Sequence, residues 1–299
     1  MSAGSVVHAR RSSLPRLMPR RLRGTSASLR LGVGILIALG ALSVIVSLIG
    51  PAPNHQELAN GLQPPRLGAH PLGTDQLGRD VLAWTAGGIR TGLLISVGVV
   101  ALTATVGIVV GLVAGYVGGA ADAILMRLVD LQLAVPGLLI FITASSVLVH
   151  TSALTLIVLL SIVGWVPYAR LVRTAILSER ERGYVAAARL AGASRLRVLR
   201  LYLLPATASV TLVLASLNAG FVLLAESALS FLGMGIQPPR ASLGYMIAQG
   251  QADLVGAWWV VVMPGIAIVL LVLAFNVIGD GLRDGRTDDA ELLARGGGR

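Results

Sequence analysis

Uncharged apolar runs long enough to cross a membrane recur along this chain. The first, residues 31–50, holds 20 residues without a charge, and a helix needs about that length to span the hydrocarbon core of a bilayer. A chain that is 55% hydrophobic, with a mean hydropathy of +0.81, is too apolar to fold as a soluble domain. We therefore predict an all-α polytopic membrane protein with six transmembrane helices, at about residues 31–50, 91–115, 131–149, 154–176, 206–225 and 258–279.

The first run also resembles the apolar core of a signal peptide, because a basic stretch precedes it. Residues 1–30 hold seven arginines and no acidic residue. The apolar region of a signal peptide typically has about 7 to 15 residues, and the small residues expected at a cleavage site fit poorly here. We expect a basic, disordered tail at residues 1–30, followed by an uncleaved first span.

Arginine carries all of the basic charge, since the 24 basic residues include no lysine. With the N-terminus inside, the six spans place 18 arginines on the cytoplasmic side and four on the outer side. This asymmetry follows the positive-inside rule, so residues 1–30, 177–204 and 280–299 are predicted to be cytoplasmic. Nucleic-acid binding is the rival interpretation, but the charge flanks the spans and only 4% of the residues are aromatic.

The residues that most catalytic and metal chemistry requires are missing from the sequence. There is no cysteine for disulfides or thiolate ligands, and the four histidines lack metal-ligand spacing. Without lysine there is no P-loop. The middle of each predicted span is uncharged, which argues against a proton- or sodium-coupled carrier, and no Ser/His pair, Asp pair or HExxH motif indicates an enzyme. We expect no catalytic residue, no metal and no cofactor bound by this chain.

A polar segment, residues 184–205, separates the fourth and fifth spans. Its first part, Val185 to Ala191, carries four alanines and one charge, which predicts a smooth helix that a partner can approach closely. Gly192 favours the left-handed conformation that ends a helix, and Ser194 is a good N-cap for a second helix. The apolar face of that second helix is predicted to consist of Leu196, Leu199 and Leu203.

This segment resembles the EAA loop of ABC importer permeases, whose pattern is Glu-Ala-Ala, three residues, Gly, nine residues, an apolar residue, one residue, Leu and Pro. Tyr202 takes the apolar position, and Ala186 stands where the family usually has Glu. The resemblance implies a coupling helix that docks in a groove of a separate ATPase, and an ordinary amphipathic loop is the alternative. The expected coupling residues are Tyr184, Ala187, Ala188, Arg189, Gly192, Ala193, Ser194, Leu204 and Pro205.

A second motif, HPLGTDQLGRDVLAWTAGGIRTGLL at residues 70–94, resembles the signature of the dipeptide, oligopeptide and nickel branch of these permeases. Thr91-Gly92 replaces its usual small-residue pair. Glycine allows tight turns, and the charged residues can form ion pairs at the membrane surface. We expect an elbow that fixes the entry into the second span, with direct substrate contact as the alternative; its residues are Gly73, Asp75, Gly78, Arg79 and Asp80.

A third motif of that branch is matched by ESALSFLGMGIQPPRASLGYMIAQG at residues 226–250, and GDGLRDGRTDD at residues 279–289 resembles the family ending. Gln237-Pro238-Pro239 forces extended backbone, so this segment is predicted to fold back as a re-entrant outer loop. We consider Glu226, Gln237 and Pro238 as candidates for a gate.

Several residues within the predicted spans have two interpretations each. Gly107, Gly111 and Gly115 lie on one helix face and permit close packing with another helix. Pro136 interrupts the third span, either as a gating kink or for packing. Two arginines near the inner end of the fourth span are expected to extend to the lipid headgroups, namely Arg170 and Arg173.

The resemblance covers most of the chain after the first span. It implies a type I ABC importer permease fold in a bacterial inner membrane, with both termini cytoplasmic. It also implies a second related permease as heterodimer partner, cytoplasmic ATPase subunits that carry ATP and Mg²⁺, and an extracytoplasmic substrate-binding protein. Di- and oligopeptides are the expected substrates. Nickel or another small solute is the alternative within the family, and a non-ABC carrier or membrane scaffold is the alternative outside it.

Overall fold

A computed structural model describes residues 22–68, 70–147 and 152–296. Most of the predicted basic tail lies outside these residues, as do the end of the third predicted span at residues 148–149 and the last three residues of the C-terminal tail. The described part is helical, apart from loops and one isolated bridge between Thr74 and Asp80. Its α-helices are α1 (Leu22–Ile49), α2 (Val81–Val117), α3 (Gly119–Leu133), α4 (Gly137–Val147), α5 (Ala153–Gly164), α6 (Val166–Glu179), α7 (Gly183–Leu190), α8 (Arg195–Val198), α9 (Leu204–Phe231), α10 (Leu243–Gly250) and α11 (Trp259–Gly296).

Four helical stretches are long and apolar enough to cross a membrane. They are Ala27–Ile49, Val81–Val117, Arg195–Phe231 and Trp259–Arg283. A fifth candidate is the pair α5 and α6, which is bent by 45° at the break near Trp165. The part of the chain that the structure covers therefore contains four candidate spans, or five when the bent pair is one span.

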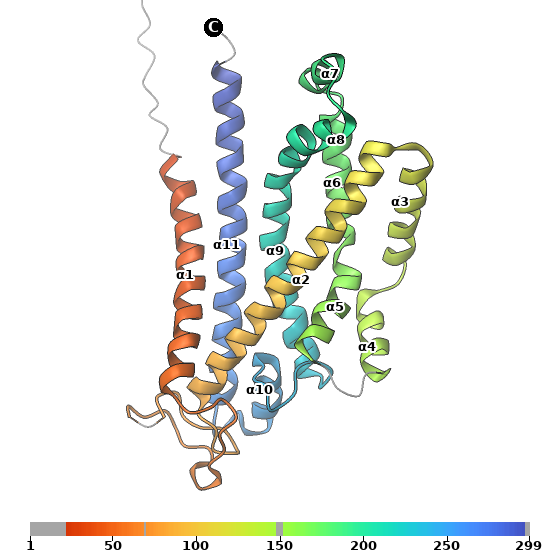
Figure 1. Cartoon of the computed structure of the whole chain (residues 1–299). Coiled ribbons are helices and arrows are strands. Elements are labelled where there is room, and N and C mark those ends of the chain that lie inside the picture. Colours follow the sequence, from red (N-terminus) through yellow and green to blue (C-terminus); the bar gives the residue numbers. More distant parts are fainter. Residues whose placement is uncertain (1–21, 69, 148–151, 297–299) are drawn as a thin grey trace, which may run out of the picture.

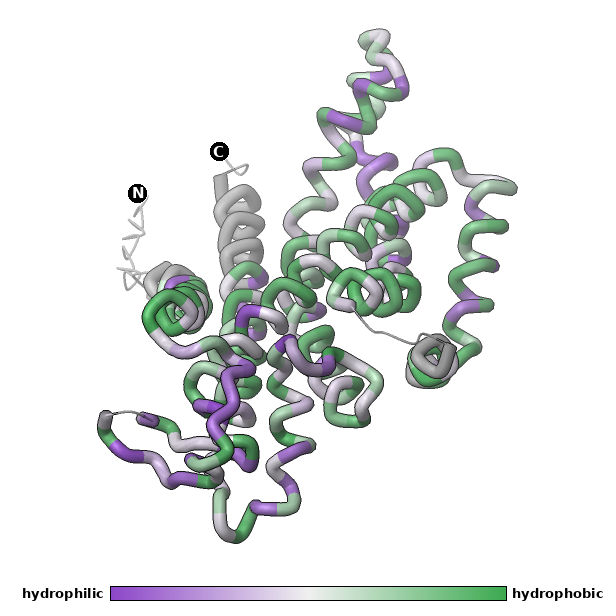
Figure 2. The backbone as a smooth tube through the Cα atoms, turned by 60° about the horizontal axis from the view of Figure 1, so that its bottom comes forward, coloured by the Kyte–Doolittle hydropathy of each residue, from purple (hydrophilic) through white to green (hydrophobic). Residues whose placement is uncertain are grey.

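The two ends of the helical bundle differ in what they carry. Figure 1 shows the beginning of α1, the end of α11 and the short helices α7 and α8 at one end, and α10 with the α1–α2 connection at the other. We call these the α7 end and the α10 end. In Figure 2 hydrophobic residues follow the helices, whereas hydrophilic residues gather in the α1–α2 connection at the lower left.

The helix boundaries follow local rules of capping and proline placement. α2 begins ten residues before the apolar run at residue 91, because the Asp80 carboxylate caps it by accepting a hydrogen bond from the Ala83 N–H at 2.8 Å. The third apolar stretch is not one continuous helix: α3 ends at Leu133 and α4 begins at Gly137. Pro136 lies in this break, since proline lacks an N–H and its ring blocks the helical conformation of the preceding residue.

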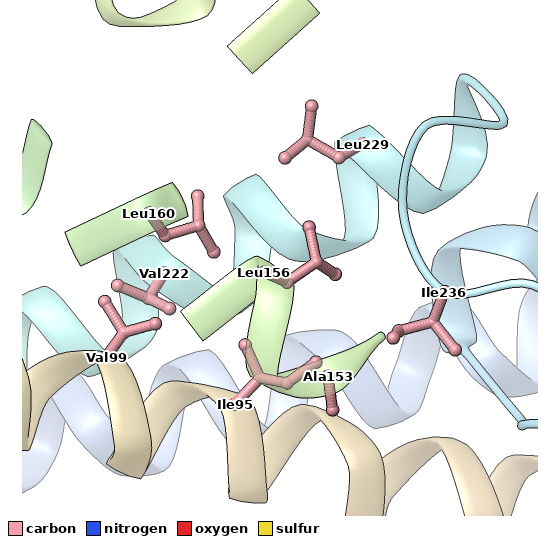
Figure 3. Close-up of a cluster of buried hydrophobic side chains, with 8 residues drawn as sticks. All are labelled: Ile95, Val99, Ala153, Leu156, Leu160, Val222, Leu229 and Ile236. Carbon is pink, nitrogen blue, oxygen red and sulfur yellow. The ribbon is translucent and has the colours of Figure 1, made fainter. Parts of the chain in front are cut away.

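A buried apolar cluster joins α2, α5 and α9 near the α10 end. Figure 3 shows Ile95 of α2 beside Ala153 of α5, with the α9 side chains facing them across the cluster. Ile236, from the segment after α9, folds back into the same cluster and is fully buried. The segment after α9 is therefore anchored on the bundle by hydrophobic burial.

The glycine stripe of α2 packs against α6. A Cβ on Gly107 would lie 2.3 Å from the Tyr168 Cβ, and one on Gly111 would lie 2.6 Å from the Ala169 carbonyl oxygen. Gly115 is similarly close to α6, because a Cβ there would lie 2.9 Å from the Ile176 Cβ. The stripe therefore serves a helix interface within this chain.

The two arginines of α6 pair with acidic residues of α3. Arg173 makes a bidentate pair with Asp122, with distances of 2.5 and 2.6 Å, and Arg170 Nη2 lies 2.6 Å from Asp130 Oδ1. The hydrogen bond from Arg173 holds the pKa of Asp122 below its ordinary value. Both arginines therefore have ion-pair partners within this chain, which the sequence alone did not predict because the partners lie on α3.

Candidate functional site

The polar segment between the fourth and fifth predicted spans folds as two short helices joined at a sharp corner. α7 ends in a Schellman motif: the Ala193 N–H donates to the Ala188 carbonyl at 3.0 Å, and the Gly192 N–H donates to the Arg189 carbonyl at 3.0 Å. Gly192 has φ +81°, and the Ser194 hydroxyl accepts from the Arg197 N–H at the start of α8. The predicted left-handed corner and N-cap are both confirmed.

One buried side chain anchors α7 to the bundle. Val185 is fully buried and packs in one cluster with Val172 and Ile176 of α6. Val198 and Leu203 complete the cluster from the other side of the corner. One close-packed cluster therefore joins α7 to α6, to α8 and to the π-helical turn that leads into α9.

The face predicted for the second helix is wrong in part. Leu196 is 54% exposed, Leu199 is half-buried, and Val198 takes the buried position together with Leu203. The cause is a π-helical turn at Leu199–Leu203, which joins α8 to α9 and shifts the register of the face. Leu204 and Pro205 therefore lie in the first turn of α9, where proline needs no hydrogen-bond partner for its nitrogen.

Tyr184 links the beginning of α7 to the elements on both sides. Its hydroxyl donates to the Glu179 carboxylate at 2.5 Å, and its ring centroid lies 5.9 Å from that of Tyr202. The hydrogen bond to Glu179, with partial burial, raises the pKa of the Tyr184 hydroxyl above its ordinary value. The side chain is exposed over part of its surface, so it remains available to a partner.

Arg189 faces a cavity between the corner and the end of α2. The cavity has a volume of about 500 Å³, and its lining includes Tyr116, Arg189 and Arg195. The Arg189 guanidinium lies 5.9 Å from the centroid of the Tyr116 ring, and the Tyr116 hydroxyl donates to the Arg195 carbonyl at 3.3 Å. The corner therefore rests against α2 as well as α6 and α9.

The outer side of α7 is exposed and weakly polar. Ala187 and Gly192 are exposed, Ala188 is half-buried, and the Leu190 side chain is 90% exposed. Leu190 therefore adds exposed apolar surface at the end of α7, next to the corner. Figure 1 places α7 at the extreme of its end of the molecule, beyond α8.

The elbow before α2 is organised around a buried ion pair. Arg79 Nε lies 2.5 Å from Asp75 Oδ2, both side chains are 5% exposed, and the guanidinium stacks on Trp84 at 4.0 Å from the ring centroid. The other Asp75 oxygen accepts the backbone N–H groups of Leu77 and Arg79 at 2.9 Å each. These contacts fully satisfy the carboxylate, which is what a buried charge requires.

The remaining elbow residues close the turn. Gly73 and Gly78 have φ +78° and +71°, and a Cβ on Gly78 would lie 1.9 Å from the Glu57 carbonyl oxygen. Besides capping α2, Asp80 is within hydrogen-bond distance of the His70 imidazole, since Oδ2 lies 2.9 Å from Nδ1. The tight turns predicted from the glycines are confirmed, and the elbow residues form one contiguous structure.

Glu226 is a buried carboxylate near the end of α9. It is 2% exposed, and Ser230 and Ser242 donate hydrogen bonds to its Oε1 at 2.8 and 3.1 Å. Ser230 also accepts from the Ile236 N–H, and Ser242 caps α10. Glu226 therefore ties together α9, the segment after it and α10. Sequence reasoning missed both serines, although each lies in the same motif as Glu226.

The other gate candidates do not join this network. The Gln237 side chain donates to the Gly233 carbonyl at 3.0 Å and is exposed, as is Pro238. The two lie in the exposed turn that leads from α9 toward α10 at the α10 end of the molecule. Across residues 22–68, 70–147 and 152–296, no group of three His, Cys, Asp or Glu side chains gathers as metal ligands would.

The model of the family of binding-protein-dependent transport system inner membrane components matches residues 107–285, which include α7, the corner and Glu226. The chain belongs to this family. It is a multi-pass inner membrane component of a transport system and not an enzyme.

Several peptide-transport permeases are similar to this binding-protein-dependent component. The di/tripeptide transport system permease protein DppC of Pseudomonas aeruginosa is 41% identical over 213 residues, 71% of this chain and 70% of its own. The oligopeptide transport system permease protein OppC of Mycobacterium tuberculosis is 41% identical over 236 residues, 79% and 81% of the two chains. The dipeptide transport system permease protein DppC of Haemophilus influenzae is 35% identical over 260 residues, 85% and 88%.

Proposed function

We propose that this chain is a permease subunit of an ATP-driven importer of di- and oligopeptides, and that α7 is the helix through which a separate ATPase acts on it. The observation that carries the proposal is the corner at Gly192, which presents the exposed Leu190 and is packed through Val185 against α6, α8 and the turn that leads into α9. The relatives named above transport di- and tripeptides, dipeptides and oligopeptides, which supports peptides as the substrate.

Six spans in a type I importer arrangement agree with the path of the chain. Four long helices and the bent pair α5–α6 supply five candidate spans. We propose that the sixth comprises the end of α3 and α4, on the two sides of the break at Pro136. In Figure 1, α3 begins at the α7 end and α4 leads toward the α10 end, which is the direction that such a span requires. With the arginine-rich segments inside, the α7 end and both termini face the cytoplasm.

The partners follow from what one such chain lacks. It has no P-loop, so ATP and Mg²⁺ are bound by ATPase subunits that dock on α7. A second, related permease completes the translocation path, and lipid covers the remaining exposed apolar faces of the spans. A substrate-binding protein delivers the peptide at the α10 end, where the elbow and α10 form the outer surface.

The mechanism is mechanical coupling through packed elements. Closure of the ATPase dimer pushes on α7, and the Schellman corner keeps α7 and α8 from hinging independently. The push passes through Val185 into α6 and through the π-helical turn into α9. These two elements move relative to α2, and the translocation path between the two permeases opens outward. ATP hydrolysis then returns the path to its inward-facing state.

The test is affinity purification in mild detergent, followed by reconstitution and peptide uptake. Recovery of a second permease and P-loop ATPases, with ATPase activity stimulated by peptide and binding protein, is expected. Leu190→Asp should reduce recovery of the ATPase without reducing recovery of the second permease, because it places a charge in the docked face. Recovery of this chain alone would instead favour a carrier or scaffold, and uptake of nickel without uptake of peptide would favour the other substrate class.

A further inference from the structure

An open cavity of about 590 Å³ lies at the α10 end, where the end of α1, the beginnings of α2 and α5 and the segment before α10 meet. Ligand pockets for small molecules typically have a volume of about 300–1,000 Å³. Ile95 of α2 lies beside Ala153 in Figure 3, which fixes the beginning of α5 against this part of α2. Most of the wall is small or apolar, including Ala52, Pro53, Gly87, Ala153 and Ala241.

Two arginines from distant parts of the sequence line this cavity. Arg90 comes from α2 and Arg240 from the segment before α10, and both are exposed. Within the part of the chain that the structure describes, neither side chain has an ion-pair or hydrogen-bond partner. The acidic side chains of the α10 end are engaged elsewhere and none lines the cavity; they are Glu57, Asp75, Asp80, Glu226 and Asp253.

The positive charge here runs against the bias of the whole sequence. Only four arginines fall in the predicted outer segments. Arg79 is neutralised by Asp75, and Arg66 lies outside the cavity. Arg90 and Arg240 therefore place two positive charges at one cavity whose wall holds no acidic residue among the described residues, so the cavity is electrostatically complementary to an anion.

We propose that this cavity binds the C-terminal carboxylate of the peptide as it enters the permease from the outer side. Guanidinium groups bind carboxylates through paired charge-assisted hydrogen bonds. The C-terminal carboxylate is the one anionic group that peptides of every sequence share, so its recognition suits a transporter that accepts many peptides. The proposal rests on the proposed function, because it names the part of the substrate that this chain recognises.

The hydroxyl groups of the cavity favour a peptide over a lipid phosphate. The Ser47 and Thr91 hydroxyls donate their hydrogens to the Ser43 and Gly87 carbonyls of their own helices, at 2.8 and 3.1 Å. Each oxygen therefore offers the cavity an acceptor, and a peptide has amide N–H groups to donate to it. A phosphodiester has no donor to offer these two oxygens.

The test uses the complete importer in proteoliposomes and one labelled tripeptide in two forms, with a free C-terminal carboxylate and with a C-terminal amide. The affinity of the binding protein for each form of the tripeptide is measured separately. The binding protein is then supplied saturated with that form. Arg90→Gln and Arg240→Gln should each reduce uptake of the free-acid form by about tenfold, and Arg90→Lys by less. Uptake of the amide form should not change. Arg66→Gln is the matched control and should leave both forms unaffected.

Three results would overturn the inference. An equal loss for both forms shows that the arginines do not recognise the carboxylate. An unchanged uptake of both forms shows that the cavity does not bind the peptide. A loss that appears only in vesicles with phosphatidylglycerol, and vanishes in phosphatidylcholine, assigns the cavity to a lipid headgroup.

A second readout separates this inference from the proposed function. A tripeptide with benzophenone in its C-terminal side chain should crosslink to the wall near Ala241, without any need for transport. The crosslink should disappear in the Arg90→Gln/Arg240→Gln variant. A specific crosslink without uptake would support peptide binding in the cavity and contradict the proposed import function. Uptake without this crosslink would support import and contradict peptide binding in the cavity.

Discussion

At the scale of single residues, Gly192 shows how one backbone conformation supports the coupling segment. Its φ of +81° costs an ordinary L-residue about 1–2 kcal/mol, whereas asparagine tolerates the left-handed region better. No atom lies within 4 Å of a Cβ placed on Gly192, so a substitution there acts through the backbone and not through a clash. The position therefore separates conformational effects from packing effects.

We predict that Gly192→Val weakens coupling and Gly192→Asn preserves most of it. The valine variant should lose most of the peptide-stimulated ATPase activity of the complex, because the Schellman corner opens and α7 no longer moves with α8. The measurement is ATPase activity with and without peptide, at equal amounts of assembled complex. Full stimulation of the valine variant would show that the geometry of the corner is not needed for coupling.

The buried pair of Asp75 and Arg79 gives a second prediction at this scale. Asp75→Asn or Arg79→Met should each destabilise the protein by about 3–5 kcal/mol, because the remaining partner is left buried without its counter-charge. The combined Asp75→Asn/Arg79→Met variant should lose less than the sum of the single variants. Thermal unfolding in detergent, followed by size-exclusion chromatography, ranks the stability losses of the two single variants and the double variant. Additive losses would mean that the two side chains contribute independently.

The elements give the next scale, and here the glycine stripe of α2 determines how closely α6 can approach. We predict that Gly111→Leu prevents the folded protein from accumulating, because a Cβ alone would already lie 2.6 Å from the Ala169 carbonyl oxygen. Gly40→Leu in α1 is the matched control, since no atom lies within 4 Å of its Cβ position. The measurement is the yield of monodisperse protein; equal yields of the two variants would contradict this account of the α2–α6 contact.

Local signals predicted these elements well where the cause was local. The Gly192 corner and the Ser194 cap depend on residues close in sequence, and the structure agrees with both. The Asp80 cap is also local, but the second span was predicted to begin ten residues later, at residue 91. The sequence left two interpretations of Pro136, a gating kink and a packing role. In the structure α3 ends before this proline, at Leu133.

The features that the sequence did not predict depend on which helices contact one another in the fold. The partners of Arg170 and Arg173 lie about 40 and 50 residues away in sequence, on α3. Ser242 reaches Glu226 only because α10 folds back onto α9. Ser230 lies one turn from Glu226 on α9 and was within reach of a local argument. The buried face after Ser194 was predicted in part wrongly, because a π-helical turn has no clear sequence signal. The roles of the coupling, elbow and gate residues stay predictions.

At the scale of the whole molecule, the lack of cysteine makes the orientation directly measurable. Any single introduced cysteine is the only thiol in the chain, so its reaction reports one position. Leu190 lies at the tip of the α7 end, and Val255 is fully exposed near the α10 end. The topology proposed from the arginine distribution puts these two residues on opposite sides of the membrane.

We predict that Val255→Cys reacts with a membrane-impermeant maleimide in spheroplasts and that Leu190→Cys reacts only after the membrane is permeabilised. Co-expression of the ATPase subunits should then protect Leu190→Cys, because the docked groove covers the side chain, but should leave Val255→Cys reactive. The opposite pattern of labelling would invert the topology and place α7 where no ATPase can reach it. Correct sidedness without protection would keep the topology and move the ATPase contact away from Leu190, to another exposed part of the α7–α8 corner.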